Sequence, residues 1–519
     1  MTAARPGRDR RAVRHPAPGG ELDAGGLARR PHVVVAGGGI AGLAAATGLA
    51  ERGVRVTLLE RERQLGGRVA GWTETTADGT RLPVSRGFHA FFRQYYNLRA
   101  LLRRADPGLS RLVPVADYPL VDDRGRRDSF RGLPRTPPWN AIAFALRSPT
   151  FRLCDLLALN AAAAAPLAAV SVPGTFRQLD DVDAETFLRR INFPAAARHL
   201  AFDVFSRSFF AEPARLSAAE LAVMFHIYFL GSSEGLVFDV PDAGFDAALW
   251  DPLGGYLTGL GADIRTGAEV ASVEPRGHGG FRVHQRAGGA LDADGVVLAT
   301  DVAGLRRIVE SSPGLADPGW RAKVAGLRNA PPFLIRRLWL DRAVQSARPA
   351  FLAVGGRPPL DNVSVLERYD RQARDWAART GGSVVELHAY AATARDAGER
   401  ALARLRELYP ETGRAAVTAE SVLWRADCPL FGPGDFGRRP RVRTPFGGLV
   451  LAGDGIRIDV PTALMERAAT TGWHAANCML ARWGLAGHDL HTVPTRGRLA
   501  PLRALAAGHG GPARPDSAG

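Results

Sequence analysis

Lysine is almost absent from this sequence of 519 residues. Lys323 is its one lysine, so nearly all of its 67 basic residues are arginine. Against 52 acidic residues they leave a formal net charge of +15, a balance that is also typical of nucleic-acid-binding proteins. The arginines, however, are scattered along the chain and often stand beside acids, and they do not form a basic stripe. We therefore expect no nucleic acid among the partners.

Cysteine is also scarce, with Cys154, Cys428 and Cys478 as its three examples. Their spacings match no metal-ligand pattern, and an odd number of cysteines does not build a disulfide framework. No apolar segment follows the basic N-terminus, as a secretory signal would require. These absences favour a protein of the reducing cytoplasm that holds no metal.

Long hydrophobic runs are missing too. The most apolar stretch, residues 156–170, is interrupted by Asn160 and Pro166, and it is shorter than the ~20 residues that a membrane-spanning helix needs. We expect the chain not to cross a bilayer. The same stretch is a candidate for peripheral docking on the inner face of the cell membrane, and a buried Ala/Leu core segment is the alternative.

The overall composition is that of an ordinary globular protein, with 46% hydrophobic and 23% charged residues. The length predicts several domains. Only the two ends depart from this pattern, because residues 1–30 and residues 486–519 are rich in Arg, Pro and Gly. We predict a disordered basic leader, with attraction to an anionic membrane as the alternative, and a flexible tail.

A βαβ unit follows the leader. Residues 32–36 are β-branched and almost wholly apolar, as in a strand buried on both faces of a parallel sheet. A G-x-G-x-x-G turn, a helix and a second strand follow, and that strand ends on an acid. Such a turn brings a pyrophosphate to the helix N-terminus, and the acid accepts hydrogen bonds from a ribose. The residues expected at the dinucleotide are Gly37, Gly39, Ile40, Ala41, Gly42 and Glu60.

The residues that follow indicate which dinucleotide binds. Gly66, Gly67 and Arg68 come directly after the ribose-binding acid. This string resembles the extension found in the flavin amine oxidase and carotenoid desaturase superfamily, where the arginine neutralises an FAD phosphate. The resemblance implies FAD as cofactor. It also implies FAD contacts from the backbone at Val270 and from Gly453 and Asp454 in a later buried strand end.

The nucleotide-type elements lie in three separate parts of the chain. We predict an α/β protein with a Rossmann-like FAD-binding domain formed by residues 31–117, 260–305 and 426–485. A mixed α+β substrate domain, residues 118–259 and 306–425, is interleaved with it. Within this second domain, Ser217 and Glu220 have the spacing of a capping box at the start of a helix.

Residues 86–98 resemble the Gly-x-His-x-Phe-Phe-x-x-Tyr-x-Asn-Ile/Leu segment of plant-type phytoene and ζ-carotene desaturases. This resemblance implies that Gly87, Phe88 and His89 lie near the isoalloxazine ring. Met465, followed by Glu466, resembles the flavin-facing helix of the same enzymes. The sequence departs from that pattern at Leu464, at Arg467 and at residues 455–459, all beside the expected flavin ring, so the chemistry is expected to differ from simple desaturation.

The whole chain resembles the isorenieratene synthases, the β-carotene desaturase/methyltransferase branch of these enzymes. The resemblance implies desaturation of a β-ionone ring with migration of one of the ring's own methyl groups, which gives an aromatic carotenoid. It also implies a lipid-dissolved carotenoid substrate and peripheral membrane association. The electron acceptor stays open between a quinone and oxygen.

Three residues are candidates for the polar role in catalysis, and each has a structural alternative. His89 stands among phenylalanines and could be a hydrogen-bonded core histidine. Arg457 and Asp459 could face the flavin or only pair with each other. Aromatic clusters at residues 88–96, 202–210 and 225–229 could line a polyene tunnel or belong to the ordinary core.

Two rival functions remain for this fold. A flavin amine oxidase would need a lysine after a tryptophan, whereas Arg321 follows Trp320 here. A prenyl-binding chaperone like the GDP-dissociation inhibitors would have no need of the flavin contacts at Glu60, Arg68 and Asp454. Both observations favour the carotenoid enzyme.

Overall fold

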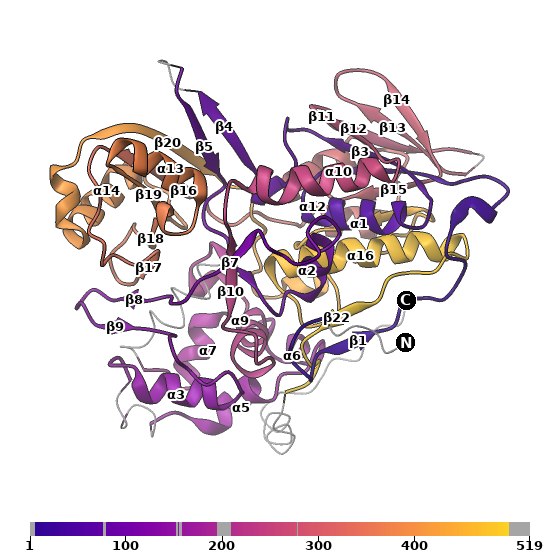
Figure 1. Cartoon of the computed structure of the whole chain (residues 1–519). Helices are drawn as coiled ribbons and strands as arrows, with labels where there is room; N and C mark the ends of the chain where they lie inside the picture. The colour runs from indigo at the N-terminus through magenta and orange to yellow at the C-terminus, as the bar shows by residue number, and fades with distance from the viewer. Residues whose placement is uncertain are drawn as a thin grey trace.

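The computed structural model describes residues 6–75, 79–151, 154, 158–194, 209–277 and 279–497. A five-stranded parallel sheet forms the centre of one half of the molecule, at the right of Figure 1. Its strand order is β11-β3-β2-β15-β21, with neighbours paired in parallel. The strands are β2 (His32–Ala36), β3 (Arg55–Glu60), β11 (Asp263–Thr266), β15 (Gly295–Leu298) and β21 (Leu449–Leu451). They come from three distant parts of the chain, as the predicted α/β class requires.

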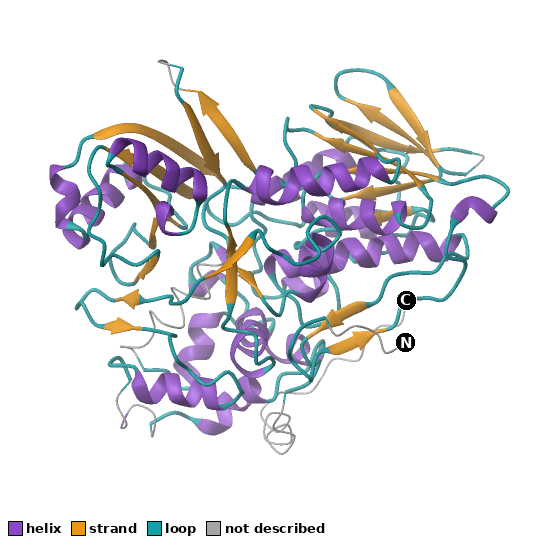
Figure 2. Ribbon diagram, viewed as in Figure 1, coloured by secondary structure: helices purple, strands orange, loops and turns teal. Residues whose placement is uncertain are grey.

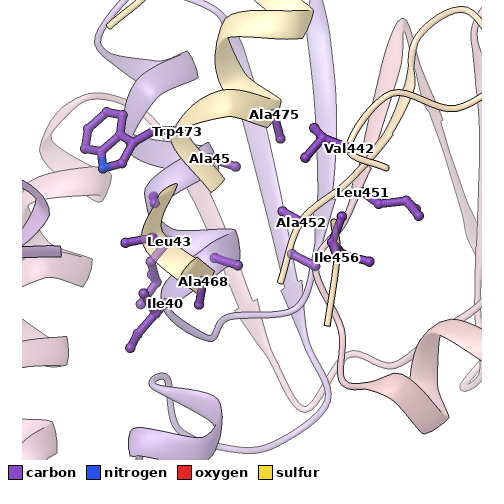
Figure 3. Packing of buried hydrophobic residues seen from close by; sticks show 14 of the residues in the cluster. Ile40, Leu43, Ala45, Val442, Leu451, Ala452, Ile456, Ala468, Trp473 and Ala475 are labelled. Carbon is purple, nitrogen blue, oxygen red and sulfur yellow. The ribbon is translucent and has the colours of Figure 1, made fainter. Parts of the chain in front are cut away.

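Two long helices, α1 (Ile40–Ala50) and α16 (Leu464–Arg482), pack against each other beside this sheet (Figure 3). Every residue of α1 is buried, which explains its composition of alanine, glycine and leucine. Small residues let the two backbones approach closely, since a Cβ at Gly472 would lie 2.3 Å from the carbonyl oxygen of Ala41. The core of this half therefore depends on residues more than 400 positions apart in sequence.

A seven-stranded sheet forms the second half, at the left of Figure 1, in the order β20-β16-β19-β18-β17-β8-β9. Its strands are β8 (Leu120–Val121), β9 (Arg127–Asp128), β16 (Phe333–Leu340), β17 (Phe351–Val354), β18 (Asn362–Val365), β19 (Ser383–Ala389) and β20 (Val417–Arg425). Helices α13 (Arg371–Thr380) and α14 (Ala397–Leu408) pack on it. One face of this sheet contributes the apolar and polar residues of the site described below.

Smaller sheets connect and extend the two halves. They are the hairpin β4 (Gly71–Thr75) and β5 (Arg81–Ser85), the β12-β13-β14 meander (Val270–Pro275, Phe281–Gln285 and Ala290–Ala293), and the β6-β10-β7 sheet (Phe91–Phe92, Phe238–Pro241 and Leu112–Pro114). The last of these pairs segments that lie more than 100 residues apart.

Several of the remaining helices form a layer below the two sheets (Figure 2). In this layer lie α3 (Trp139–Arg147), α5 (Ala161–Ala168), α6 (Gly174–Leu179), α7 (Ala184–Arg190) and α9 (Ala218–Phe225). Elsewhere are α2 (Tyr96–Leu102), α10 (Asp251–Gly259), α11 (Val302–Glu310), α12 (Pro318–Ala325) and α15 (Asp435–Arg438). Single-turn helices occupy Ala24–Gly26, Gly67–Val69, Pro213–Arg215, His226–Leu230, Asp246–Trp250, Leu366–Arg368 and Pro410–Arg414. Among the described residues, no helix is both long and apolar enough to cross a membrane.

The two ends of the chain differ from expectation. Strand β1 (Val13–His15) pairs antiparallel with β22 (Leu490–Thr492). The Asp9 carboxylate is buried and accepts a hydrogen bond from the backbone N–H of Ser233 at 2.7 Å. The prediction of disorder was therefore wrong for residues 6–30, and that of a flexible tail was wrong for residues 486–497. Backbone pairing between the two ends supplies the order that their composition does not indicate.

The predicted capping box is half right. The Ser217 hydroxyl accepts the backbone N–H of Ala219 at the start of α9. Glu220 does not reach back to the cap, because its buried carboxylate pairs instead with Arg439 and Arg467, each at 2.7 Å.

Candidate active site

A cavity of about 370 Å³ lies between the two large sheets. One end is bordered by the glycine turn after β2 and the end of β3. The other end is bordered by aromatic residues and by β16, β18 and β19. Nearly all of the predicted cofactor-binding residues border this single space. The members that do so are Gly37, Gly39, Ile40, Ala41, Glu60, Gly66, Gly67, Arg68, Phe88, His89, Val270, Gly453, Asp454 and Met465.

The glycine turn forms an open cradle at the start of α1. Gly37 adopts a φ of 108°, a conformation that favours glycine. A Cβ at Gly42 would lie 1.8 Å from the Gly37 carbonyl oxygen, so only glycine allows the helix to start this close to the strand. No side chain caps the N-terminus of α1 at Gly39. The first N–H groups of the helix are thus available to an anion in the cavity.

Glu60 lies at the end of β3 beside this cradle. Its carboxylate accepts the backbone N–H of Gly38 at 2.6 Å and that of Glu62 at 2.8 Å. Burial raises the pKa of Glu60. Val270 borders the same end of the cavity, so the structure brings together two of the residues that are expected to contact the cofactor.

Arg68 and Asp454 form an ion pair across the middle of the cavity. Arg68 follows Gly66 and Gly67, both of which have positive φ. A Cβ at Gly66 would lie 2.4 Å from Nε1 of Trp250, so this turn also requires glycine. The pair presents one cationic and one anionic group to a ligand at this point.

The start of α16 closes the middle of the cavity through Leu464, Met465 and Ala468. Leu464 has a φ of 51°, in the left-handed region that non-glycine residues rarely adopt. Such backbone strain gathers at functional sites. Two of the residues at which the sequence departs from the desaturase pattern thus lie in different surroundings. Leu464 borders the cavity, whereas Arg467 points away from it and binds Glu220.

Glu466 has a structural role in helix capping. Its carboxylate accepts the backbone N–H of Asn97 at 2.8 Å and that of Leu98 at 2.9 Å, at the start of α2. Burial raises its pKa to about 8. Although Met465 borders the cavity, the carboxylate of Glu466 binds backbone and does not border it.

His89 borders the cavity. Its Nδ1 lies 2.8 Å from the carbonyl oxygen of Gly87, and burial lowers its pKa to about 4. The neutral ring donates from Nδ1 and leaves Nε2 as an acceptor. Gly87 itself lies directly behind the cavity wall, where a Cβ would lie 2.5 Å from Cδ1 of Ile335.

The other two catalytic candidates do not border the cavity. Nε of Arg457 lies 2.9 Å from Oδ1 of Asp459, and Arg441 binds the second carboxylate oxygen at 3.0 Å. The Arg457 guanidinium also stacks on Phe436 at 4.2 Å. We therefore correct the expectation of a catalytic role, because these contacts satisfy both side chains outside the cavity.

Aromatic rings line the half of the cavity farther from Glu60. The ring centroids of Phe88 and Phe351 are 4.3 Å apart, and those of Tyr118 and Phe351 are 5.0 Å apart and stacked. Phe92 and Tyr228 meet edge to face at 4.6 Å. Part of each of the three aromatic clusters in the sequence thus lines the cavity, although residues 202–208 lie outside the described part of the chain. The aromatic residues that border the cavity are Phe88, Phe92, Tyr95, Tyr118, Phe130, Phe210, Tyr228, Phe238, Phe333, Phe351 and Tyr390.

Sequence reasoning missed one polar group of the cavity wall. His388 and Tyr390 border the aromatic half together with Asn362, and Glu386 binds His388 from behind at 2.8 Å. The signal was present, since Glu386, His388 and Tyr390 alternate in a strand and must therefore share one face of it. Buried polar residues at alternating positions of a strand therefore indicate a functional site that glycine motifs do not reveal.

The lysine of the rival amine oxidase interpretation does not reach the site. Lys323 on α12 is exposed and does not border the cavity. Arg321 donates to the carbonyl oxygens of Val309 and Ser312 at 2.8 and 2.9 Å. Lys323 thus lies at the surface, and Arg321 binds backbone at the end of α11.

Comparison with known proteins identifies the family. The family model described as flavin containing amine oxidoreductase matches residues 40–480. A carotenoid phi-ring synthase of Streptomyces griseus is 56% identical over 508 residues, which cover 97% of this chain and 98% of that protein. A carotenoid phi-ring synthase of Chlorobaculum tepidum is 28% identical and covers 89% of this chain and 90% of its own. A 15-cis-phytoene desaturase of Synechococcus elongatus is 23% identical over 87% of this chain and 96% of its own.

Solved structures share the fold. Wild-type putrescine oxidase bound to putrescine has a TM-score of 0.64 at 17% identity and covers 88% of this chain and 100% of its own. Cyclohexylamine oxidase from Brevibacterium oxydans has a TM-score of 0.63 at 16% identity over the same shares of both chains. These likenesses concern the fold alone. The family match and the level of identity show that the chain belongs to the flavin-containing amine oxidoreductases and, within them, to the carotenoid phi-ring synthases.

Proposed function

We propose that this protein uses FAD to desaturate the β-ionone rings of a carotenoid such as β-carotene, with an intramolecular methyl shift, to give aromatic φ rings. One observation carries the proposal: a single cavity joins the dinucleotide cradle to a chamber walled by aromatic side chains. The relatives named phi-ring synthases support the choice of product.

The residues present fit FAD. A cradle without side chains faces the cavity at Gly39, where an added Cβ would meet nothing closer than 3.8 Å. In this proposal Glu60 would accept hydrogen bonds from ribose hydroxyls, and Arg68 would bind a phosphate or the ring system beyond it. When bound, the flavin supplies a two-electron acceptor for hydride.

The aromatic chamber supplies the remaining conditions for the reaction. A β-ionone ring must lose two hydrogen pairs, and one of its geminal methyl groups must move before the ring can become aromatic. Loss of hydride leaves a ring cation, and the faces of Phe88, Tyr118 and Phe351 can stabilise positive charge. The same rings exclude water, which would otherwise add to such a cation.

Helix α3 is proposed as the membrane contact through which a lipid-dissolved substrate enters. Its outer face exposes Trp139, Ile142 and Leu146, with exposed fractions of 61%, 44% and 68%. These spacings form one apolar stripe on the helix. Arg131 and Arg135, both exposed, precede the stripe and complement an anionic lipid surface.

The inner face of α3 leads to the cavity. Phe144 stacks on Phe130 with ring centroids 4.8 Å apart, and Phe130 borders the cavity. This position replaces the docking segment expected at residues 156–170. In that stretch Leu167 is half-buried against the main core, whereas Leu156 and Leu157 lie outside the described residues.

Expression in a host that accumulates β-carotene tests the proposal. We expect the extracted pigment to contain aromatic rings, and the purified protein to be yellow with bound FAD. Feeding the host methyl-labelled methionine should leave the ring methyl groups unlabelled, because the migrating methyl comes from the substrate. Unchanged β-carotene beside a folded, FAD-loaded protein would overturn the proposed reaction, and label in the ring would overturn the intramolecular shift.

A further inference from the structure

A polar chain ends at the wall of the aromatic chamber. Glu386, His388 and Tyr390 lie on one face of β19 and just after its end, and Asn362 is the register partner of His388 on β18. Three of these four residues border the cavity, and the carboxylate of Glu386 lies one step behind them. A chain of this kind connects the cavity to a fixed charge in the sheet.

The hydrogen bonds of this chain have one consistent direction. Nε2 of His388 lies 2.8 Å from Oε1 of Glu386, and Nδ1 lies 2.9 Å from the hydroxyl of Tyr390. An ionised carboxylate only accepts hydrogen bonds, so Nε2 carries the ring proton and Nδ1 accepts from the phenol. Asn362 donates its Nδ2–H to the same phenol oxygen at 3.0 Å. The phenol proton thus points toward the imidazole, and one lone pair of the oxygen is left for the cavity.

Glu386 is held in its ionised form. Nε and Nη2 of Arg337 bind its Oε2 at 2.9 and 2.6 Å, and Arg337 also donates to Ser85 and to the carbonyl oxygen of Pro83. Burial alone would raise the pKa of Glu386, but Arg337 and His388 outweigh it and lower that pKa to about 2. The carboxylate therefore stands ready to stabilise an imidazolium at His388.

The chain also touches the segment next to the expected flavin ring. The backbone N–H of Phe88 points at Nε2 of His388 from 3.3 Å, but the contact of Nε2 with the ionised Glu386 is shorter, at 2.8 Å, and sets the tautomer in which Nε2 carries the proton. A Cβ at Gly87 would lie 2.7 Å from Cε1 of His388. His388 is thus packed directly behind the Gly87–His89 turn, whose members Phe88 and His89 border the cavity. A substrate ring in the chamber would meet the phenol of Tyr390 within the same enclosed space.

We infer that Tyr390, His388 and Glu386 form the proton acceptor for ring aromatisation, with Tyr390 as the group that touches the substrate. This inference rests on the proposed function and names the base of that reaction. In each desaturation a C–H bond of the ring cation breaks, and its electron pair becomes the new ring double bond. The proton binds the Tyr390 oxygen while the phenol's own proton moves to Nδ1 of His388. A bound flavin would supply the acceptor for the matching hydride, so that each desaturation removes one hydride and one proton from the ring.

The simpler alternative is a purely structural role, in which an ion pair stabilises the sheet. The pair of Arg337 and Glu386 would be enough for that role, which needs neither His388 nor a phenol at the cavity wall. Tyr390 and Asn362 extend the hydrogen-bond network away from this ion pair and into the chamber. The direction of the chain, from fixed charge to cavity, is that of a proton path.

Two conservative variants test the inference. Tyr390→Phe removes one hydroxyl and His388→Gln removes the basic nitrogen, so each should lower the rate of aromatic ring formation at least about 100-fold while FAD content and carotenoid binding stay unchanged. Tyr409→Phe and His284→Gln are matched controls in which the same groups are removed away from the cavity, and they should keep the wild-type rate. Tyr409 makes no hydrogen bond through its hydroxyl in the described structure, and His284 is a half-buried residue of β13 that does not border the cavity.

Chemical rescue separates a base from a merely structural histidine. In His388→Ala, added imidazoles should restore ring formation with a rate that rises with the basicity of the imidazole. Rescue that is equal for all imidazoles, or wild-type rates in Tyr390→Phe, would overturn the inference. Loss of activity in His89→Gln with full activity in Tyr390→Phe would assign the base to His89 instead. If the wild-type protein forms no aromatic rings, the proposed function fails, whereas a failure of the variants alone overturns only the relay.

Discussion

The carboxylate of Glu220 on α9 binds the guanidinium of Arg467 on α16, with Oε2 and Nη2 2.7 Å apart. Both side chains are buried, and Arg439 binds the second carboxylate oxygen. This contact ties the helical layer to the helix that closes the cofactor cavity. Arg467, at which the sequence departs from the desaturase pattern that it resembles, therefore serves the packing of this chain.

Glu220→Gln should therefore destabilise the protein strongly. The change leaves two buried guanidinium groups without a counter-charge, a loss worth about 3 to 5 kcal/mol in the free energy of unfolding. Urea unfolding followed by tryptophan fluorescence measures it. Glu185→Gln is the control, since its pair with Arg189 is exposed at 3.6 Å and should contribute less than about 1 kcal/mol. Equal losses in both variants would contradict the prediction.

Glu60→Ala should yield folded protein with little flavin. The carboxylate is expected to make charge-assisted hydrogen bonds to the cofactor worth about 1.5 to 3 kcal/mol, so its loss should weaken FAD binding roughly ten- to a hundredfold. Arg68→Ala should act in the same direction. Absorbance at 450 nm per protein measures the effect, and Glu310→Ala on the exposed end of α11 is the control. Full occupancy in Glu60→Ala would show that this end of the cavity does not hold the adenosine.

His89 should make stability depend on pH in the acid range. Its folded-state pKa of about 4 lies below the ordinary value of 6.5, so between these values the unfolded chain binds more protons than the folded one. Stability should fall as the pH drops from 6.5 toward 4, by up to about 3 kcal/mol from this residue. His89→Gln should flatten that part of the curve of unfolding free energy against pH. An unchanged slope would place the acid sensitivity in other groups.

Replacing Trp139 and Leu146 by Asp should release the protein from anionic liposomes. The exposed apolar stripe of α3 is the surface that enters the lipid, and two charges there oppose its insertion. Flotation with vesicles measures binding, and FAD absorbance checks that the fold persists. Leu22→Asp is the matched control, because Leu22 is 71% exposed but lies on the N-terminal segment. Undiminished flotation of the α3 variant would move the membrane contact elsewhere.

The buried Glu466 provides a separate test of helix capping. At a pH above about 8, where the carboxyl of Glu466 is ionised, Glu466→Gln keeps the shape of the side chain but exchanges one accepting oxygen for a donor, which faces the N–H of Asn97 or Leu98. An unsatisfied buried donor costs about 1 to 3 kcal/mol, so we expect a loss of that size in the free energy of unfolding. FAD content should stay close to that of the wild type, because the carboxylate binds backbone and not the cavity.

The amino-acid sequence by itself determined the cofactor end of the site. Close approach of backbone to a pyrophosphate demands glycine at fixed spacing, and a ribose demands an acid at the end of the next strand. Gly37, Gly42 and Glu60 therefore carry a local signal that survives without a structure. The resemblance of residues 86–98 to carotenoid desaturases added His89, and the structure places that residue at the cavity.

Only the tertiary structure decided which polar groups border the cavity. Arg457 and Asp459 are close in sequence to cofactor motifs, yet they turn outward and satisfy each other. Tyr390 directly follows β19 and Asn362 begins β18, and their shared hydrogen bond exists only because the sheet aligns these two strands. The order of the N-terminal segment has the same origin, since β1 needs β22, almost 480 residues later, to pair its backbone. Contacts between distant segments follow from packing, and no local pattern of residues records them.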